Sequence, residues 1–195
     1  MNRRLILVTP AATAATRLSR FATDDPLDEA ARVAVARLRL GVHPRTAVIT
    51  APTVACVQTA AGAGLDAKIE PAVRDWDLGR WRGQVLTDVN EDQLAQWIGQ
   101  PASAPHGGES LTALIDRVQL WLDAVPAGRT VAIVSTAVAR AAIVSALAAG
   151  PELFWRLDLA PLTAAALSGR CGRWNLQSSG QHVCSVPALT RRVSG

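Results

Sequence analysis

The chain has no tyrosine, only two phenylalanines and only three histidines, and its single lysine is Lys68. Its charged residues are scattered, and no run of five like charges occurs. A net charge of +4 without a basic cluster argues against a dedicated DNA-binding or RNA-binding protein. The abundance of alanine, and of arginine in place of lysine, indicates the coding bias of a GC-rich bacterial genome.

Long apolar runs and ligand-binding motifs are also missing. No stretch approaches the roughly eighteen uncharged apolar residues of a membrane span, so we expect a cytoplasmic protein with no membrane contact. No glycine-rich phosphate loop and no His/Cys metal cluster occurs, which predicts neither cofactor nor metal. Cys56 is expected to be a small buried residue, and a Cys171–Cys184 disulfide is left open.

Two short apolar runs, residues 5–8 and 131–134, have no polar alternation and predict strands buried on both faces of a parallel sheet. The first run ends at Thr9 and Pro10, and the second ends at Ser135 and Thr136. In open α/β sheets, ligands bind outside the carboxyl ends of the strands. If the two strands are neighbours, these four residues form the floor of one pocket.

The remaining pattern predicts one domain over residues 1–195, with a loose tail from about residue 187. Asp25 before Pro26 is expected to cap a helix, and Ser110 or Gly108 to cap another. The expected helices are 27–40, 51–61, 86–98, 109–125 and 137–148; the expected strands are 46–50, 67–70, 156–159, 163–167 and 173–176, with a hairpin turn at 169–172.

Five segments, in order, resemble the histidine phosphatase superfamily, whose fold is phosphoglycerate mutase-like. Residues 25–29 resemble its D-x-P-L-T stretch, and residues 50–60 resemble S-S-P-x-x-R-A-x-Q-T-A. Residues 75–83 resemble E-x-D-F-G-x-W-E-G, residues 105–110 resemble P-x-G-G-E-S, and residues 131–135 resemble the strand before V-S-H-G. The resemblance implies a three-layer α/β/α sandwich with a mostly parallel central sheet and an antiparallel edge.

The same resemblance implies that the catalytic groups of the family are replaced. Its R-H-G-E-T motif, which carries the histidine nucleophile, falls on residues 9–13, so Pro10 stands at the nucleophile. Its arginine falls on Ala55 and its second histidine on Thr136, while Glu109 falls at the proton-donor position. The degenerate pocket positions are therefore Thr9, Pro10, Thr13, Ala55 and Thr136.

These replacements predict a pseudoenzyme without phosphohistidine chemistry, serving as a binding or regulatory protein for a small ligand or a protein partner. One alternative is a hydrolase that uses Glu109 with a bound water, and another is a structural subunit of a homo-oligomer. Glu109 is more simply interpreted as an early-helix carboxylate that is stabilised by the helix dipole. Other candidate ligand-binding residues are Arg17, His106, Ser110 and Arg140, although His106 reads more simply as a solvated loop residue and Arg140 as a surface helix residue.

Overall fold

The computed structural model describes residues 2–38, 40–170 and 172–189. Within them, six strands form one sheet in the order β3-β2-β4-β1-β5-β6. The strands are β1 (Arg3–Val8), β2 (Thr46–Thr50), β3 (Lys68–Ile69), β4 (Gly128–Ile133), β5 (Thr163–Arg170) and β6 (Arg173–His182).

Strands β1 and β4 are the two central strands, as the apolar runs predict. They pair in parallel, with Val8 opposite Ile133, so the chain leaves both strands at the same edge of the sheet. Strands β2 and β3 continue the parallel part on one side, whereas β5 pairs antiparallel with β1 and β6 antiparallel with β5. The mostly parallel sheet with an antiparallel edge is therefore confirmed.

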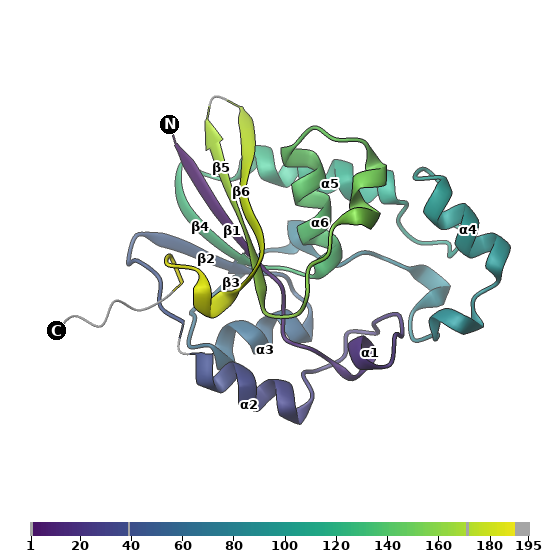
Figure 1. Ribbon diagram of the computed structural model, residues 1–195, viewed down its shortest axis with the longest axis horizontal. Helices are drawn as coiled ribbons and strands as arrows, with labels where there is room; N and C mark the ends of the chain where they lie inside the picture. Colours follow the sequence, from purple (N-terminus) through teal and green to yellow (C-terminus); the bar gives the residue numbers. More distant parts are fainter. Residues whose placement is uncertain (1, 39, 171, 190–195) are drawn as a thin grey trace.

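Helices cover both faces of this sheet. Helices α2 (Glu29–Leu38) and α3 (Val54–Gly62) pack together on one side, and α5 (Leu111–Ala124) and α6 (Thr136–Ala146) pack together on the other (Figure 1). The apolar faces of α5 and α6 bury Leu114, Val118, Leu122, Val138 and Ala142 completely. This burial, rather than helix propensity, is the main source of stability for such helices.

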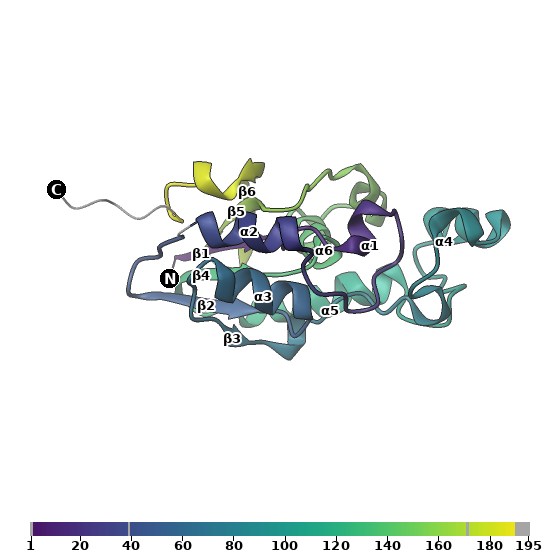
Figure 2. The ribbon, with the colours of Figure 1, turned by 90° about the horizontal axis from the view of Figure 1, so that it is seen from below.

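A lobe projects from the body between β3 and α5. It carries α4 (Glu91–Gly99), which lies far from the sheet in both ribbon views (Figures 1 and 2). An aromatic cluster fixes the base of this lobe: Trp76 stacks on Trp97 with ring centroids 5.0 Å apart, and Trp155 meets Trp97 edge-on at 4.7 Å. Within the described residues, no helix is long and apolar enough to cross a membrane.

Several predicted boundaries are wrong for identifiable reasons. Asp25 does not cap α2; the Asp28 carboxylate does, by accepting from the Ala31 N–H at 2.7 Å. Residues 86–88 form a separate 3-10 turn, so α4 starts only after the Asn90 cap. Residues 156–159 are not a strand, because the 3-10 helix Pro151–Arg156 occupies the start of that stretch.

The C-terminal segment is packed against the body of the protein as far as Leu189. Leu189 is fully buried and its carbonyl accepts from the Gly41 N–H, so the chain is packed to that point rather than loose from residue 187. Residues 190–195 and Cys171 lie outside the described residues. The Cys171–Cys184 disulfide that the sequence left open therefore also lies outside them. Cys56 is buried and Cys184 is exposed, and both are free.

Candidate ligand-binding cavity

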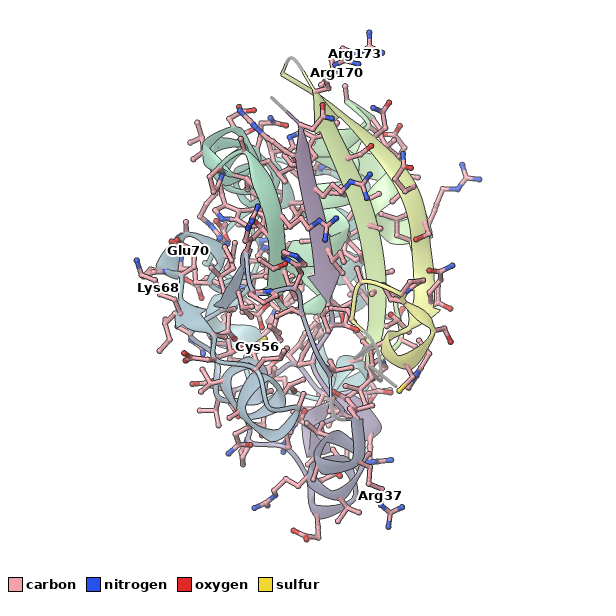
Figure 3. The ribbon with its side chains drawn as sticks, turned by 90° about the vertical axis from the view of Figure 1, so that its left-hand side faces the viewer. Arg37, Cys56, Lys68, Glu70, Arg170 and Arg173 are labelled. Carbon is pink, nitrogen blue, oxygen red and sulfur yellow. The ribbon has the colours of Figure 1, made fainter. Side chains whose placement is uncertain are left out.

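A cavity of about 400 Å³ opens at the edge of the sheet where β1 and β4 end. Its wall includes Pro10 and Ala11 after β1, Thr136 after β4, and Ala55 at the start of α3. Figure 3 labels Cys56, another wall residue, near the end of the sheet toward which β1 points. The volume is within the range of about 300–1,000 Å³ that is usual for small-molecule sites.

The structure brings four of the five degenerate pocket positions together in this wall: Pro10, Thr13, Ala55 and Thr136. The fifth, Thr9, is buried beneath them. Its hydroxyl lies 2.7 Å from the Ala160 carbonyl and accepts from the Thr163 N–H at 3.0 Å. Thr9 therefore ties the end of β1 to the start of β5.

Glu109 does not line the cavity. Its two carboxylate oxygens accept from Nε and Nη2 of Arg117, each at 2.8 Å, and Arg74 lies 3.6 Å from Oε1. This bidentate pair is nine-tenths buried on the glutamate side. The neighbouring Ser110 caps α5, because its hydroxyl accepts from the Ala113 N–H at 3.1 Å. Both side chains thus serve the start of α5 in this structure.

The other predicted ligand-binding side chains also lie outside the wall. Arg17 is exposed and pairs with Asp28. Arg140 lies with its guanidinium carbon 5.8 Å from the centre of the Phe154 ring, and burial lowers its pKa.

His106 is not a solvated loop residue: it is only 1% exposed, against the rings of Trp81 and Trp76. Its Nδ1 accepts from the Gly108 N–H at 3.0 Å, and burial lowers its pKa. It therefore belongs to the aromatic cluster.

The charged residues that do line the cavity are three aspartates, Asp24, Asp25 and Asp75. Among the described residues in its wall there is no arginine, lysine or histidine. Asp25 is paired, because Arg20 donates to its Oδ1 at 3.2 Å. Asp24 and Asp75 form no ion pair with any described side chain. The cavity is consequently acidic where a phosphate site would be basic.

Asp24 reaches the cavity through an unusual backbone conformation. Its φ angle of +72° lies in the left-handed region, which aspartate tolerates better than most residues. From there its carboxylate accepts from the Val54 N–H at 2.7 Å. Thr53, the preceding cap residue, makes no side-chain cap bond, so Asp24 satisfies a free donor at the N-terminus of α3 from a distant part of the chain.

Asp75 occupies a similar place at α6. Its Oδ1 accepts from the Trp76 N–H at 2.8 Å, and its carboxylate is hydrogen-bonded to the Ser135 side chain. The Ser135 hydroxyl also caps α6 by accepting from the Val138 N–H at 3.3 Å. Burial raises the pKa of Asp75; the bonds to Ser135 and Trp76 and the more distant charges of Arg82 and Arg117 only oppose this effect.

Two helix N-termini therefore face the cavity. Asp24 accepts directly from the first turn of α3, whereas at α6 the acceptor is the Ser135 hydroxyl, to which Asp75 is hydrogen-bonded. A helix N-terminus carries roughly half a positive charge and is a ready site for an anion such as phosphate. Here the Asp24 carboxylate takes that part at α3, and the Ser135 hydroxyl takes it at α6. The described residues contain no group of His, Cys, Asp or Glu side chains placed to hold a metal ion, so the aspartates do not converge as metal ligands.

Comparisons with known proteins identify the family and the fold. The family model of the histidine phosphatase superfamily (branch 1) matches residues 10–182. The chain therefore belongs to the histidine phosphatase superfamily. A search of curated proteins found no match.

Solved structures of similar fold include a histidine-to-alanine mutant of phosphoserine phosphatase from Entamoeba histolytica with phosphoserine. It is 16% identical, with a TM-score of 0.81, and the match covers 94% of this chain and 100% of that one. A mycobacterial glucosyl-3-phosphoglycerate phosphatase is 22% identical, with a TM-score of 0.76 and coverage of 93% and 100%. A protein from Thermus thermophilus is 24% identical, with a TM-score of 0.73 and coverage of 90% and 98%. At these identities the likeness establishes the fold.

Sequence reasoning missed the three aspartates as site residues. Asp25 is expected at a helix cap, and Asp24 is simply its neighbour in a polar turn. Asp75 offers one usable signal, because it stands at the first, acidic position of the motif that residues 75–83 resemble. Nothing local in the sequence indicates that Asp24 reaches the start of α3, thirty residues later.

Proposed function

We propose that this chain is a non-catalytic member of its superfamily that binds a small ligand in the cavity at the ends of β1 and β4. One observation carries the proposal: the cavity wall holds three aspartates and, among its described residues, no cationic side chain. The chain keeps a hollow of ligand size in the place where open α/β proteins bind ligands. Among the described residues of that hollow, no side chain is a histidine nucleophile or a cation that would hold a phosphoryl group.

The chemistry argues in the same direction. Phosphoryl transfer depends on an aligned nucleophile and on positive groups that stabilise the phosphate oxygens. Pro10 has no nucleophilic atom, and Ala55 and Thr136 carry no charge. Loss of the nucleophile alone costs about a millionfold in kcat in subtilisin. Here Asp24 and Asp75 would in addition repel a phosphate dianion.

A phosphatase assay with adduct detection tests this proposal. The protein is incubated with p-nitrophenyl phosphate and a set of phosphomonoesters between about pH 5 and about pH 8, a range that spans histidine titration. Samples are denatured at alkaline pH, where a phosphohistidine survives, and are analysed by intact mass. We expect no turnover above buffer and no phosphorylated protein. Turnover accompanied by a covalent phosphate adduct would refute the proposal.

A hydrolase with altered chemistry is the second candidate, and Asp75 is the observation that favours it. A carboxyl group with a raised pKa beside a hydroxyl is suited to general acid or base catalysis. Asp75 is better placed for this than Glu109, whose oxygens are held by Arg117. Ester or phosphate turnover that disappears in Asp75→Asn, but survives in Glu109→Gln, would support the hydrolase.

A structural subunit would give a different result. It predicts an obligate oligomer whose contacts cover the cavity mouth, which sedimentation velocity over a range of protein concentrations detects. A monomer that is stabilised by a cavity ligand supports the binding function.

A further inference from the structure

We infer that the cavity binds a small organic ammonium ion, with the charged group toward Asp24 and Asp75 and the apolar body against the rest of the wall. This inference rests on the proposed function and specifies the class of ligand. It is carried by three features of the same cavity: its volume, two carboxylates without a cationic partner among the described side chains, and an otherwise mostly apolar lining.

Asp24 and Asp75 carry negative charge that no described cation neutralises. Carboxylates taken out of water are normally paired with a cation, because desolvation of an ion is costly. Asp75 is only partly exposed and makes hydrogen bonds, yet no described arginine or lysine forms an ion pair with it. Asp24 is exposed, so water compensates much of its charge; it forms no ion pair with a described side chain, and it holds a left-handed backbone angle. Unfavourable features of this kind persist at ligand sites, where the ligand supplies the missing interaction.

The sign and size of the net charge in the cavity indicate the charge of the ligand. Arg20 neutralises Asp25, and the N-termini of α3 and α6 each contribute roughly half a positive charge. About one net negative charge is then left in the cavity. This remainder suits a ligand with one positive charge and disfavours a phosphate, a carboxylate or a polycation.

The apolar lining of the cavity favours an organic cation over a metal ion. The indole of Trp76 is fixed in the wall, because its Nε1 donates to the Glu109 carbonyl at 2.7 Å and its ring stacks on Trp97. Further apolar wall residues are Pro10, Ala11, Ala22, Ala55, Leu78, Leu159 and Pro161. A hydrated metal ion gains nothing from such a surface, whereas an alkyl or aryl ammonium ion buries its carbon skeleton there.

A charge series on one carbon skeleton tests the inference. Phenethylammonium, phenethyl alcohol and hydrocinnamate share an aryl-ethyl body and differ in the sign of the head group, and choline adds a quaternary ammonium. Binding is measured by thermal shift and by NMR titration. We expect phenethylammonium to bind about tenfold more tightly than the alcohol, which corresponds to one charge interaction in a partly desolvated site. Hydrocinnamate is expected to bind most weakly.

Three single substitutions assign the effect to the cavity. Asp24→Asn and Asp75→Asn each remove one charge and keep an acceptor for the Val54 or Trp76 N–H. Each is expected to weaken phenethylammonium binding about tenfold, with little change for the alcohol. Asp116→Asn removes an exposed carboxylate on α5 and serves as the matched control, with unchanged binding expected. Circular dichroism and thermal melts establish that each variant is folded.

Several outcomes would overturn the inference. They are equal binding of phenethylammonium and phenethyl alcohol, unchanged binding in both cavity variants, or no binding of phenethylammonium or choline at millimolar concentration. Each of these results leaves the proposed function intact if the protein also lacks phosphate turnover. Turnover with a phosphate adduct, in contrast, refutes the proposed function whatever the ammonium ions do.

Discussion

Replacement of Arg117 by methionine should destabilise the protein strongly, because this side chain joins the start of α5 to the segment before the projecting lobe. Its guanidinium makes the two 2.8 Å bonds to Glu109 and donates through Nη1 to the carbonyls of Ala72 and Arg74, at 2.9 and 3.1 Å. The Arg117 side chain is 13% exposed and the Glu109 side chain 10%. Arg117 thus fastens α5 to the segment that carries Asp75.

The size of the effect follows from what is left behind. Methionine fills much of the arginine stem, but Glu109 becomes a nearly buried carboxylate whose nearest cation is Arg74 at 3.6 Å, and two carbonyls lose a donor. Removal of one partner of a buried ion pair costs about 3–5 kcal/mol. For a domain of this length that corresponds to a fall in Tm of about 6–20 °C.

Thermal and urea unfolding of wild type, Arg117→Met, Glu109→Gln and the double variant measure this effect as a cycle. We expect the double variant to be less destabilised than the sum of the two single variants, by about 0.5–3 kcal/mol of coupling. A fall in Tm below about 2 °C for Arg117→Met, or additive effects, would refute the reasoning. In that event the salt bridge does not stabilise the fold.

Three further predictions concern the same region. Burial lowers the pKa of His106, so as the pH falls below about 6.5 this histidine is protonated in the unfolded state before it is protonated in the folded state. The free energy of unfolding should therefore fall in this pH range. Urea titrations should find a smaller loss in His106→Asn. Gly108→Ala would place a Cβ 2.2 Å from the Asp77 carbonyl oxygen and should cost about 1–3 kcal/mol in thermal melts, whereas Gly99→Ala, with no atom within 4 Å, should not. Asp75→Asn should raise the Tm at neutral pH, because the raised pKa of Asp75 means that its ionised form destabilises the fold. The gain in Tm should shrink as the pH falls through the folded-state pKa toward 3.8, where Asp75 is protonated in both states. A Tm that is the same in wild type and variant at all pH values would contradict this prediction.

The central strands could be predicted from the sequence because the signal is local. Residues 5–8 and 131–134 are continuous apolar runs with sharp ends, and only a sheet buried on both faces accommodates two of them side by side. The convergence of Pro10 and Thr136 on one cavity follows from that pairing alone. Helix starts were less predictable, because several polar residues compete to cap them: Asp28 rather than Asp25 caps α2.

The charge of the cavity could not be predicted, since it depends on contacts between segments far apart in the chain. Asp24 acts at the start of α3, and Asp75 acts on Ser135, sixty residues away. The same holds for Glu109, which is an acid of the first helical turn in the sequence but is held by Arg117, eight residues further along α5. His106 stands in a polar stretch, yet the rings of Trp76, Trp81 and Trp97 bury it.

The two cavity carboxylates also bear on how this fold is stabilised without an anion. A pair of helix N-termini pointed at a hollow leaves backbone donors that need acceptors, and a bound phosphate can supply them. In this chain the Asp24 carboxylate and the Ser135 hydroxyl, which is hydrogen-bonded to Asp75, supply acceptors from within. A phosphate would therefore have to compete with Asp24 and Ser135 for these donors. On the ligand class proposed above, this chain pairs the fold of its superfamily with a cavity that prefers cations to anions.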